Sequence, residues 1–167
     1  MSVRILILLL VAGTSVGCQS TGSTRADDST TVICTTDDDR SRRIEAFLDG
    51  YQAEDLSKAS DLFAEGVEFF WGTPEEPFDI DGWREAMRAQ HDQFDDIEMA
   101  DRMITTGTYP DGMTWTTVWC IWRGTNVANG ERPEYLLHLS YKWSGDEIVA
   151  EYGFFDAGRF AEEFEQG

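Results

Sequence analysis

The sequence predicts a single α+β domain, with amphipathic helices first and an antiparallel sheet after them. Three observations lead to this class. The 167 residues are about one domain's worth of chain. Apolar residues recur at helical spacing up to about residue 94, and long extended runs with tight-turn signals follow. Helices followed by strands are typical of a helical layer that covers one face of a curved sheet.

The composition describes a very acidic chain that can still build a core. Asp and Glu number 32 against 13 Lys and Arg, which gives a formal charge of -19, and 41% of the residues are hydrophobic. Such a field repels phosphate backbones, so we expect no nucleic-acid partner. The aromatic content is too high for a disordered acidic chain.

The N-terminus has the layout of a secretory signal, with Arg4, the apolar run 5–12 and then small residues. Because the small residues end in Gly17-Cys18, the segment resembles a bacterial lipoprotein signal, which would place a lipid on Cys18. We therefore expect a signal peptide over 1–17 and a protein held at the cell envelope, with its lipid anchor as the one membrane contact. Ordinary cleavage and secretion are the alternative.

Residues 18–36 are rich in Ser, Thr, Gly and Asp and are predicted to form a flexible tether, so that the domain spans 37–167. Cys34 lies in this tether and Cys120 in a predicted strand. A disulfide between them is compatible with an oxidising compartment, but their contexts favour a free Cys34 and a buried Cys120. The sequence has no CxxC or HExxH spacing, and we expect neither a metal nor a cofactor.

Three helices are predicted before the sheet. The first starts near residue 40, the second follows a cap at Asp55 and ends at Gly66, and the third opens at Asp81. Their apolar faces are Ile44, Phe47, Leu48 and Tyr51; Leu56, Ala59, Leu62 and Phe63; and Trp83, Ala86, Met87, Gln90 and Phe94. A strand over 67–71 and a turn-rich loop over 72–77 separate the second helix from the third.

Four extended runs follow the third helix, at 97–109, 113–124, 134–143 and 148–155. The turn signals between them are Pro110-Asp111-Gly112, Asn129-Gly130 and Ser144-Gly145-Asp146. Consecutive strands joined by such turns predict an antiparallel meander.

Three segments resemble the nuclear transport factor 2-like superfamily and, within it, the SnoaL-like branch. They are a helix-helix-strand opening at 53–70, a glycine-initiated third helix at 80–90 and a final hairpin at 140–156. The resemblance covers about residues 40–167. It implies a cone-like domain in which three N-terminal helices pack on a strongly curved antiparallel sheet around an apolar pocket. It implies no single activity, because the superfamily includes isomerases, cyclases, dehydratases and association domains.

The acid–base residues of the ketosteroid isomerase-like members are missing at the matching positions. Trp71 and Phe47 stand where the resemblance implies a proton-abstracting Asp and a Tyr donor. In the final strand Ala150 stands where an acid is common, and a regular pleat places Glu151 on the opposite side.

Two histidines are the candidate general bases. His91 lies at the edge of the third helix's apolar face, with Asp92 or Asp95 as a nearby acid, and His138 lies on the more polar side of its strand. The alternative for each is a structural side chain on a helix or sheet surface.

The aromatic content points to a pocket more clearly than the titratable groups do. Six Trp and five Tyr either fill the core or line a pocket for a flat apolar ligand. The candidate ligand-binding residues are Tyr51, Trp71, Trp83, Met87 and Trp119.

We therefore expect a SnoaL-like domain that binds a small apolar molecule in an aromatic pocket. An acid–base enzyme of isomerase, cyclase or dehydratase type, or a non-catalytic dimeric association module, is the alternative. The strand 113–124 carries large side chains on both sides, which indicates that the outer face of the sheet is covered, most simply by a second copy in a homodimer.

Overall fold

The computed structural model describes residues 31–73 and 75–165. The predicted signal peptide and the lipid site at Cys18 lie outside this part of the chain. Among the described helices, none combines the length and the hydropathy needed to cross a bilayer.

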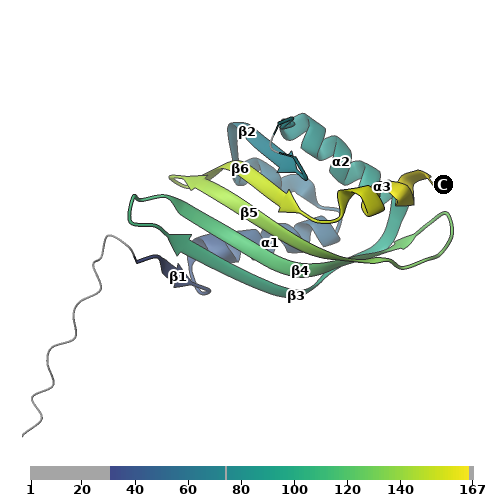
Figure 1. The fold of residues 1–167 in the computed structure, drawn as a ribbon, viewed down its shortest axis with the longest axis horizontal. Coiled ribbons are helices and arrows are strands. Elements are labelled where there is room, and N and C mark those ends of the chain that lie inside the picture. The colour runs from purple at the N-terminus through teal and green to yellow at the C-terminus, as the bar shows by residue number, and fades with distance from the viewer. Residues whose placement is uncertain (1–30, 74, 166–167) are drawn as a thin grey trace, which may run out of the picture.

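Six strands form one sheet in the order β1-β3-β4-β5-β6-β2, as Figure 1 shows. In chain order the elements are β1 (Ile33–Thr35), α1 (Asp39–Gln52), the 3-10 helix η2 (Leu56–Asp61), β2 (Phe63–Trp71), α2 (Ile80–Gln93), β3 (Phe94–Thr108), β4 (Thr114–Asn126), β5 (Glu134–Ser144), β6 (Glu147–Phe154) and α3 (Ala157–Glu165). The predicted α+β class and the meander from β3 to β6 are confirmed.

The sheet is mixed, and the prediction of a wholly antiparallel sheet is wrong in one place. β2 runs parallel to β6, with Trp71 beside Gly153, whereas the other pairs of neighbouring strands are antiparallel. The connection between β2 and β6 passes through α2 and three strands, so a sequence pattern of adjacent hairpins does not reveal it.

Two α-helices and one 3-10 turn, rather than three helices, precede the meander. Asp38 caps α1 by accepting a hydrogen bond from one backbone N–H of the first turn, and Asp79 caps α2 by accepting from two. The second predicted helix ends early, because the chain is already extended at Phe63. Gly66, predicted as its end, lies in β2 with a φ of 79° where the pairing with β6 shifts register.

A further α-helix, α3, follows the last strand and is absent from the sequence prediction. Its Phe160 ring lies 5.2 Å from the Trp122 ring, 5.2 Å from that of Tyr135 and 5.9 Å from that of Phe94. Packing against these rings stabilises α3, because its nine residues are too few for a helix to be stable alone.

The predicted tether contributes one strand to the sheet. Ile33–Thr35 pair with residues 106–108 of β3 at the sheet edge, so order begins before the predicted boundary at residue 37. All three residues are exposed, and the strand is held by backbone hydrogen bonds rather than by buried side chains. Its sequence therefore shows no alternation of apolar and polar residues that would predict a strand. Cys34 is exposed and free and Cys120 is buried and free, which is the arrangement that their sequence contexts favour.

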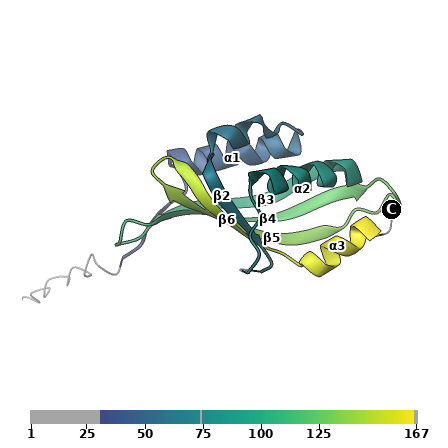
Figure 2. The ribbon, with the colours of Figure 1, turned by 90° about the horizontal axis from the view of Figure 1, so that it is seen from above.

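The helices α1 and α2 lie on one side of the sheet (Figure 2). The Phe47 ring of α1 lies 5.7 Å from the Trp83 ring of α2, and Trp83 stacks on Phe69 of β2 at 5.7 Å. Two bulges in β3, where Asp96 and Asp101 have φ near 50°, bend the sheet around this core. The layer between helices and sheet is therefore aromatic, and it contains the candidate site.

Candidate functional site

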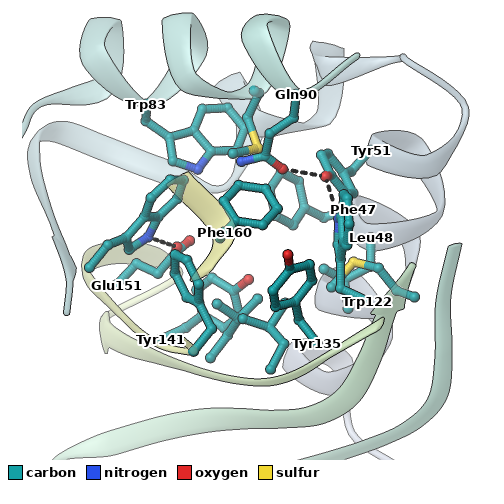
Figure 3. A pocket seen from close by; sticks show the side chains of 16 residues that line it. Phe47, Leu48, Tyr51, Trp83, Gln90, Trp122, Tyr135, Tyr141, Glu151 and Phe160 are labelled. Atoms are coloured by element: carbon teal, nitrogen blue, oxygen red, sulfur yellow. Dashed lines mark hydrogen bonds between the residues drawn. The ribbon is translucent and has the colours of Figure 1, made fainter. Parts of the chain in front are cut away.

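A cavity of about 70 Å³ lies between the helices and the inner face of the sheet. Nine of its sixteen lining residues are aromatic. Figure 3 shows Phe47, Leu48 and Tyr51 approaching from α1, Trp83 and Gln90 from α2, and Trp122, Tyr135, Tyr141 and Glu151 from the sheet. Lining residues that are half-buried, among them Trp71, Leu137 and Phe160, mark the side nearest the surface.

Glu151 places a carboxylate in this aromatic surrounding. Its side chain is 2% exposed, and its Oε1 accepts a hydrogen bond of 2.9 Å from the indole Nε1 of Trp71 (Figure 3). Burial raises the pKa of Glu151 to about 7, and the bond from Trp71 opposes that rise. The carboxyl group therefore changes its protonation state near neutral pH.

The prediction that Glu151 points away from the pocket is wrong, because β6 carries one extra residue. Tyr141 and Trp143 are two residues apart on β5, but their partners Glu151 and Ile148 are three residues apart on β6. This bulge reverses the alternation of side chains, so Glu151 shares the inner face with Ile148. Glu151 thus places an acid on the inner face of the last strand, one residue after Ala150, the position at which the resemblance implies an acid.

A glycine allows Trp71 to reach Glu151. Gly153 lies beside Trp71 in the parallel pairing of β2 with β6. A Cβ atom at Gly153 would lie 2.7 Å from the Cδ1 atom of Trp71, closer than side chains approach. The indole therefore crosses β6 at the one place where no side chain obstructs it.

Tyr141 brings an unpartnered hydroxyl to the same cavity. It is 0% exposed, and its hydroxyl forms no hydrogen bond within the described residues. Burial, and then the negative charge of Glu151, raises the pKa of Tyr141 well above its ordinary value. A neutral hydroxyl without a protein partner is available to a bound molecule.

A hydrogen-bonded chain closes the opposite wall. Trp122 donates from Nε1 to the Tyr51 hydroxyl at 2.9 Å, and Tyr51 donates to Gln90 Oε1 at 2.6 Å, as the dashed lines in Figure 3 show. Both functions of the Tyr51 hydroxyl are occupied, so this hydroxyl holds α1, α2 and β4 together.

At the far end of the cavity, α3 is attached by a polar cluster. Tyr135 donates to Glu163 Oε1 at 2.8 Å, and Asn126 Nδ2 donates to Glu163 Oε2 at 3.2 Å. Phe160, one turn earlier on α3, lines the cavity. Glu163 therefore positions the aromatic side chain that closes this end.

Four of the five predicted ligand-binding residues line the cavity: Tyr51, Trp71, Trp83 and Met87. The fifth, Trp119, lies on the outer face of the sheet, where it is 53% exposed. The alternation along β4 turns Trp122 inward and Trp119 outward.

Neither predicted histidine lines the cavity. On α2 the side chains that face it are Trp83, Met87 and Gln90, and His91 is directed instead against α1, with its ring 5.0 Å from the Tyr51 ring. Burial lowers the pKa of His91, and Glu54 and Asp92 oppose this change. His91, a candidate general base at the edge of the apolar face of this helix, therefore lies outside the cavity lining.

His138 lies on the outer face of β5, as its place on the more polar side predicts. Its ring packs at a tilt against that of Trp119, with 4.1 Å between centroids, and its Nε2 is 3.0 Å from the Ser140 hydroxyl. Within the described residues, no group of three or more His, Cys, Asp or Glu side chains is arranged to hold a metal ion.

No protein-family model matches the sequence, and a search of curated proteins finds no match. Solved structures do match. IdmH, a proposed polyketide cyclase from Streptomyces antibioticus, is similar with a TM-score of 0.58 and 17% identity over 77% of this chain and 99% of that one. An NTF2-like protein from Anabaena variabilis gives a TM-score of 0.56 and 16% identity over 70% and 85% of the two chains.

A third similar structure is a hypothetical protein of ketosteroid isomerase-like fold from Catenulispora acidiphila, solved in complex with trimethylamine. It gives a TM-score of 0.52 and 11% identity over 69% of this chain and 85% of that one. At these identities the likeness concerns the fold. The domain has the nuclear transport factor 2-like fold, as the resemblance found in the sequence implies.

Proposed function

We propose that this protein is a SnoaL-like domain that binds a compact, largely apolar molecule in the aromatic cavity, with Glu151 as the polar anchor. The observation that carries the proposal is a carboxylate 2% exposed among aromatic side chains, with one hydrogen-bond donor, Trp71, among the described residues. Buried polar groups of this kind orient ligands in apolar pockets.

The cavity volume limits the size of the ligand. About 70 Å³ is well below the roughly 300–1,000 Å³ of pockets that hold drug-sized molecules. A molecule of several fused rings exceeds this space, whereas a compact aliphatic molecule fits it. The trimethylamine complex of a protein with a similar fold supports a ligand of that size.

Tryptophan fluorescence with tert-butanol as a neutral probe tests the proposal. We expect saturable binding, because Trp71, Trp83 and Trp122 line the cavity. Leu137→Phe should abolish binding by filling the cavity. Leu136→Phe, which adds the same group to the outer face where Leu136 is 78% exposed, should not. Absence of saturable binding, or an equal effect of the two variants, refutes the proposal.

A second candidate function is proton transfer, and the Glu151 pKa near 7 favours it. Glu151 would remove a proton from the carbon next to a carbonyl, and the C–H electron pair would form an enolate whose oxygen accepts a hydrogen bond from the Tyr141 hydroxyl. The Glu151 carboxyl would then exchange this proton for a deuteron from the solvent, and transfer of the deuteron to the enolate carbon would regenerate the carboxylate and the ketone. Deuterium uptake by cyclopentanone in D₂O tests this: we expect acceleration that rises through pH 7 and disappears in Glu151→Gln. Uptake at the buffer rate rules it out.

We also propose the predicted homodimer, formed through the outer face of the sheet. Met103, Trp119, His138 and Phe154 occupy one row of paired positions across β3, β4, β5 and β6, and Leu136 lies beside it. These residues carry no carboxylate, so a contact here sets no like charges directly against each other in a chain whose net charge is -19.

Anchoring at the cell envelope through Cys18 is a proposal that the N-terminal sequence supports. Mass spectrometry of the mature protein from a bacterial host tests it. A lipid mass on Cys18 supports the anchor, and an unmodified chain cleaved near this position supports secretion.

A further inference from the structure

We infer that the molecule bound in the cavity is a small alkylammonium cation, held by the Glu151 carboxylate and the surrounding aromatic rings. The inference rests on the proposed function, because it names the ligand class of the same cavity. Three properties of the site lead to it: an acid without a counter-charge, a small aromatic enclosure and available hydrogen-bond acceptors.

The first property is the missing counter-charge of Glu151. Among the cavity-lining residues there is no Lys, Arg or His. The carboxylate accepts one hydrogen bond, from Trp71, within the described residues. Buried carboxylates are normally paired with a cation or held by several donors. A cationic ligand would supply the charge that the protein itself leaves out.

The second property is the aromatic enclosure. Nine of the sixteen lining residues are aromatic, and Trp71 and Tyr141 adjoin Glu151 directly. The faces of such rings attract cations, and cages of this kind recognise quaternary ammonium groups. In a cavity of about 70 Å³ a bound cation lies against several rings at once.

The third property is the set of available hydrogen-bond acceptors. The Tyr141 hydroxyl is fully buried, lines the cavity and has no partner in the described part of the chain. Its oxygen and the Glu151 carboxylate can each accept a hydrogen bond from an ammonium N–H. A hydroxyl without a partner beside a carboxylate in an apolar cavity matches a compact amine better than it matches a hydrocarbon.

Other charged ligands fit the site less well. A calcium ion takes six to eight oxygen ligands, whereas this cavity offers one carboxylate with tyrosine hydroxyls and an amide. An anion would be repelled by Glu151 and by the overall charge of -19, and the same field draws organic cations toward the molecule.

Glu151 is the cavity group that titrates near neutral pH. Other titratable and charged groups near it are Tyr51 on α1, His91 on α2 behind Tyr51, Cys120 on β4, Tyr135 and Tyr141 on β5, and Glu163 and Arg159 on α3 beside Tyr135. Burial raises the pKa of Cys120 to about 11. Burial raises the pKa of each of the three tyrosines above its ordinary value. Binding of a cation should therefore follow the ionisation of Glu151.

Titration of the protein with tetramethylammonium chloride and with tert-butanol, at constant ionic strength and several pH values, tests the inference. Tetramethylammonium keeps its charge at every pH, so any pH dependence comes from the protein. At pH 8.5 we expect it to bind at least about tenfold more tightly than tert-butanol. Its affinity should fall about tenfold per pH unit below 7, while that of tert-butanol stays constant.

Glu151→Gln should lower tetramethylammonium affinity at least about tenfold and remove its pH dependence, while tert-butanol binding, a test of folding, persists. Glu68→Gln is the matched control, since Glu68 is exposed on β2 next to the residue that pairs with Glu151, and it should change neither affinity.

The outcomes separate the two proposals. If tert-butanol binds but tetramethylammonium does not, or if Glu151→Gln keeps full tetramethylammonium affinity, the cation inference is overturned and the proposed function stands. If neither probe binds, the proposed function fails and the inference fails with it.

Discussion

Tyr141 and Glu151 pair directly across β5 and β6, and both side chains face the cavity. Side chains in such cross-strand pairs are neighbours, with Cβ atoms about 4.5–5.5 Å apart. The pair unites a hydroxyl without a partner and a carboxyl group whose pKa burial raises to about 7. A hydrogen-bond donor and a titratable acid therefore lie side by side in an apolar enclosure.

The stability of the protein should depend on the ionisation of Glu151. Its pKa rises from an ordinary value of 4.5 to about 7 on folding, so between these pH values the folded state keeps a proton that the unfolded chain has released. The stabilisation of the folded state that comes from the protonated Glu151 is fully present below pH 4.5 and is lost as pH rises to 7. The free energy of unfolding should fall by about 3 kcal/mol over this range.

Urea unfolding of the wild type and of Glu151→Gln at pH 4.5, 6 and 7.5 measures this loss. The variant cannot ionise at this position, so it does not lose this stabilisation. The difference between the free energy of unfolding of the variant and that of the wild type should therefore increase in favour of the variant as pH rises. A difference that is the same at all three pH values would contradict the burial of an ionisable Glu151.

Gly153→Ala should displace Trp71. The new Cβ atom would meet the Trp71 ring at 2.7 Å, so we expect a loss of about 1–3 kcal/mol in the free energy of unfolding. Loss of the indole N–H bond should also raise the Glu151 pKa further, which carbon-13 NMR of the carboxyl group measures. Gly158→Ala, where a Cβ makes only an ordinary contact at 3.7 Å, is the control; it should not destabilise the protein and should leave the Glu151 pKa unchanged.

Two buried tyrosines should respond differently to loss of the hydroxyl. Tyr51→Phe leaves Trp122 Nε1 and Gln90 Oε1 without their partner, and should cost about 1–3 kcal/mol of stability. Tyr141→Phe removes a hydroxyl that has no partner in the described residues, and should cost close to nothing. Equal losses in urea unfolding would show that the Tyr141 hydroxyl is structural.

The proposed dimer should separate when a charge enters the outer face. Leu136→Asp places a carboxylate beside the apolar row that contains Trp119, and sedimentation velocity should then show a monomer. Met113→Asp adds the same charge at an exposed position between β3 and β4 and should leave the dimer intact. A wild-type protein that sediments as a monomer at micromolar concentration contradicts the proposal.

The order of elements follows from sequence periodicity, because burial on one face imposes a period of 3.6 on α1 and α2 and a period of 2 on the strands. The same periodicity identified Tyr51, Trp83 and Met87 as cavity residues, since the apolar face of a helix must turn toward the sheet. Cavity residues that lie on the apolar face of a helix could thus be predicted from their helical spacing in the sequence.

The chemistry of the cavity was decided by contacts between segments distant in the chain. The bulge in β6 depends on its pairing with β5, and it turns Glu151 inward against the simple alternation. The parallel pairing of β2 with β6 brings Trp71 to that carboxylate, and α3 closes the cavity through rings supplied by other elements. The spacing of residues within one segment shows which of its faces is apolar. Strand register and the pairing of distant strands depend on contacts across the whole sheet, and here they determine where Glu151, the acid that lines the cavity, lies.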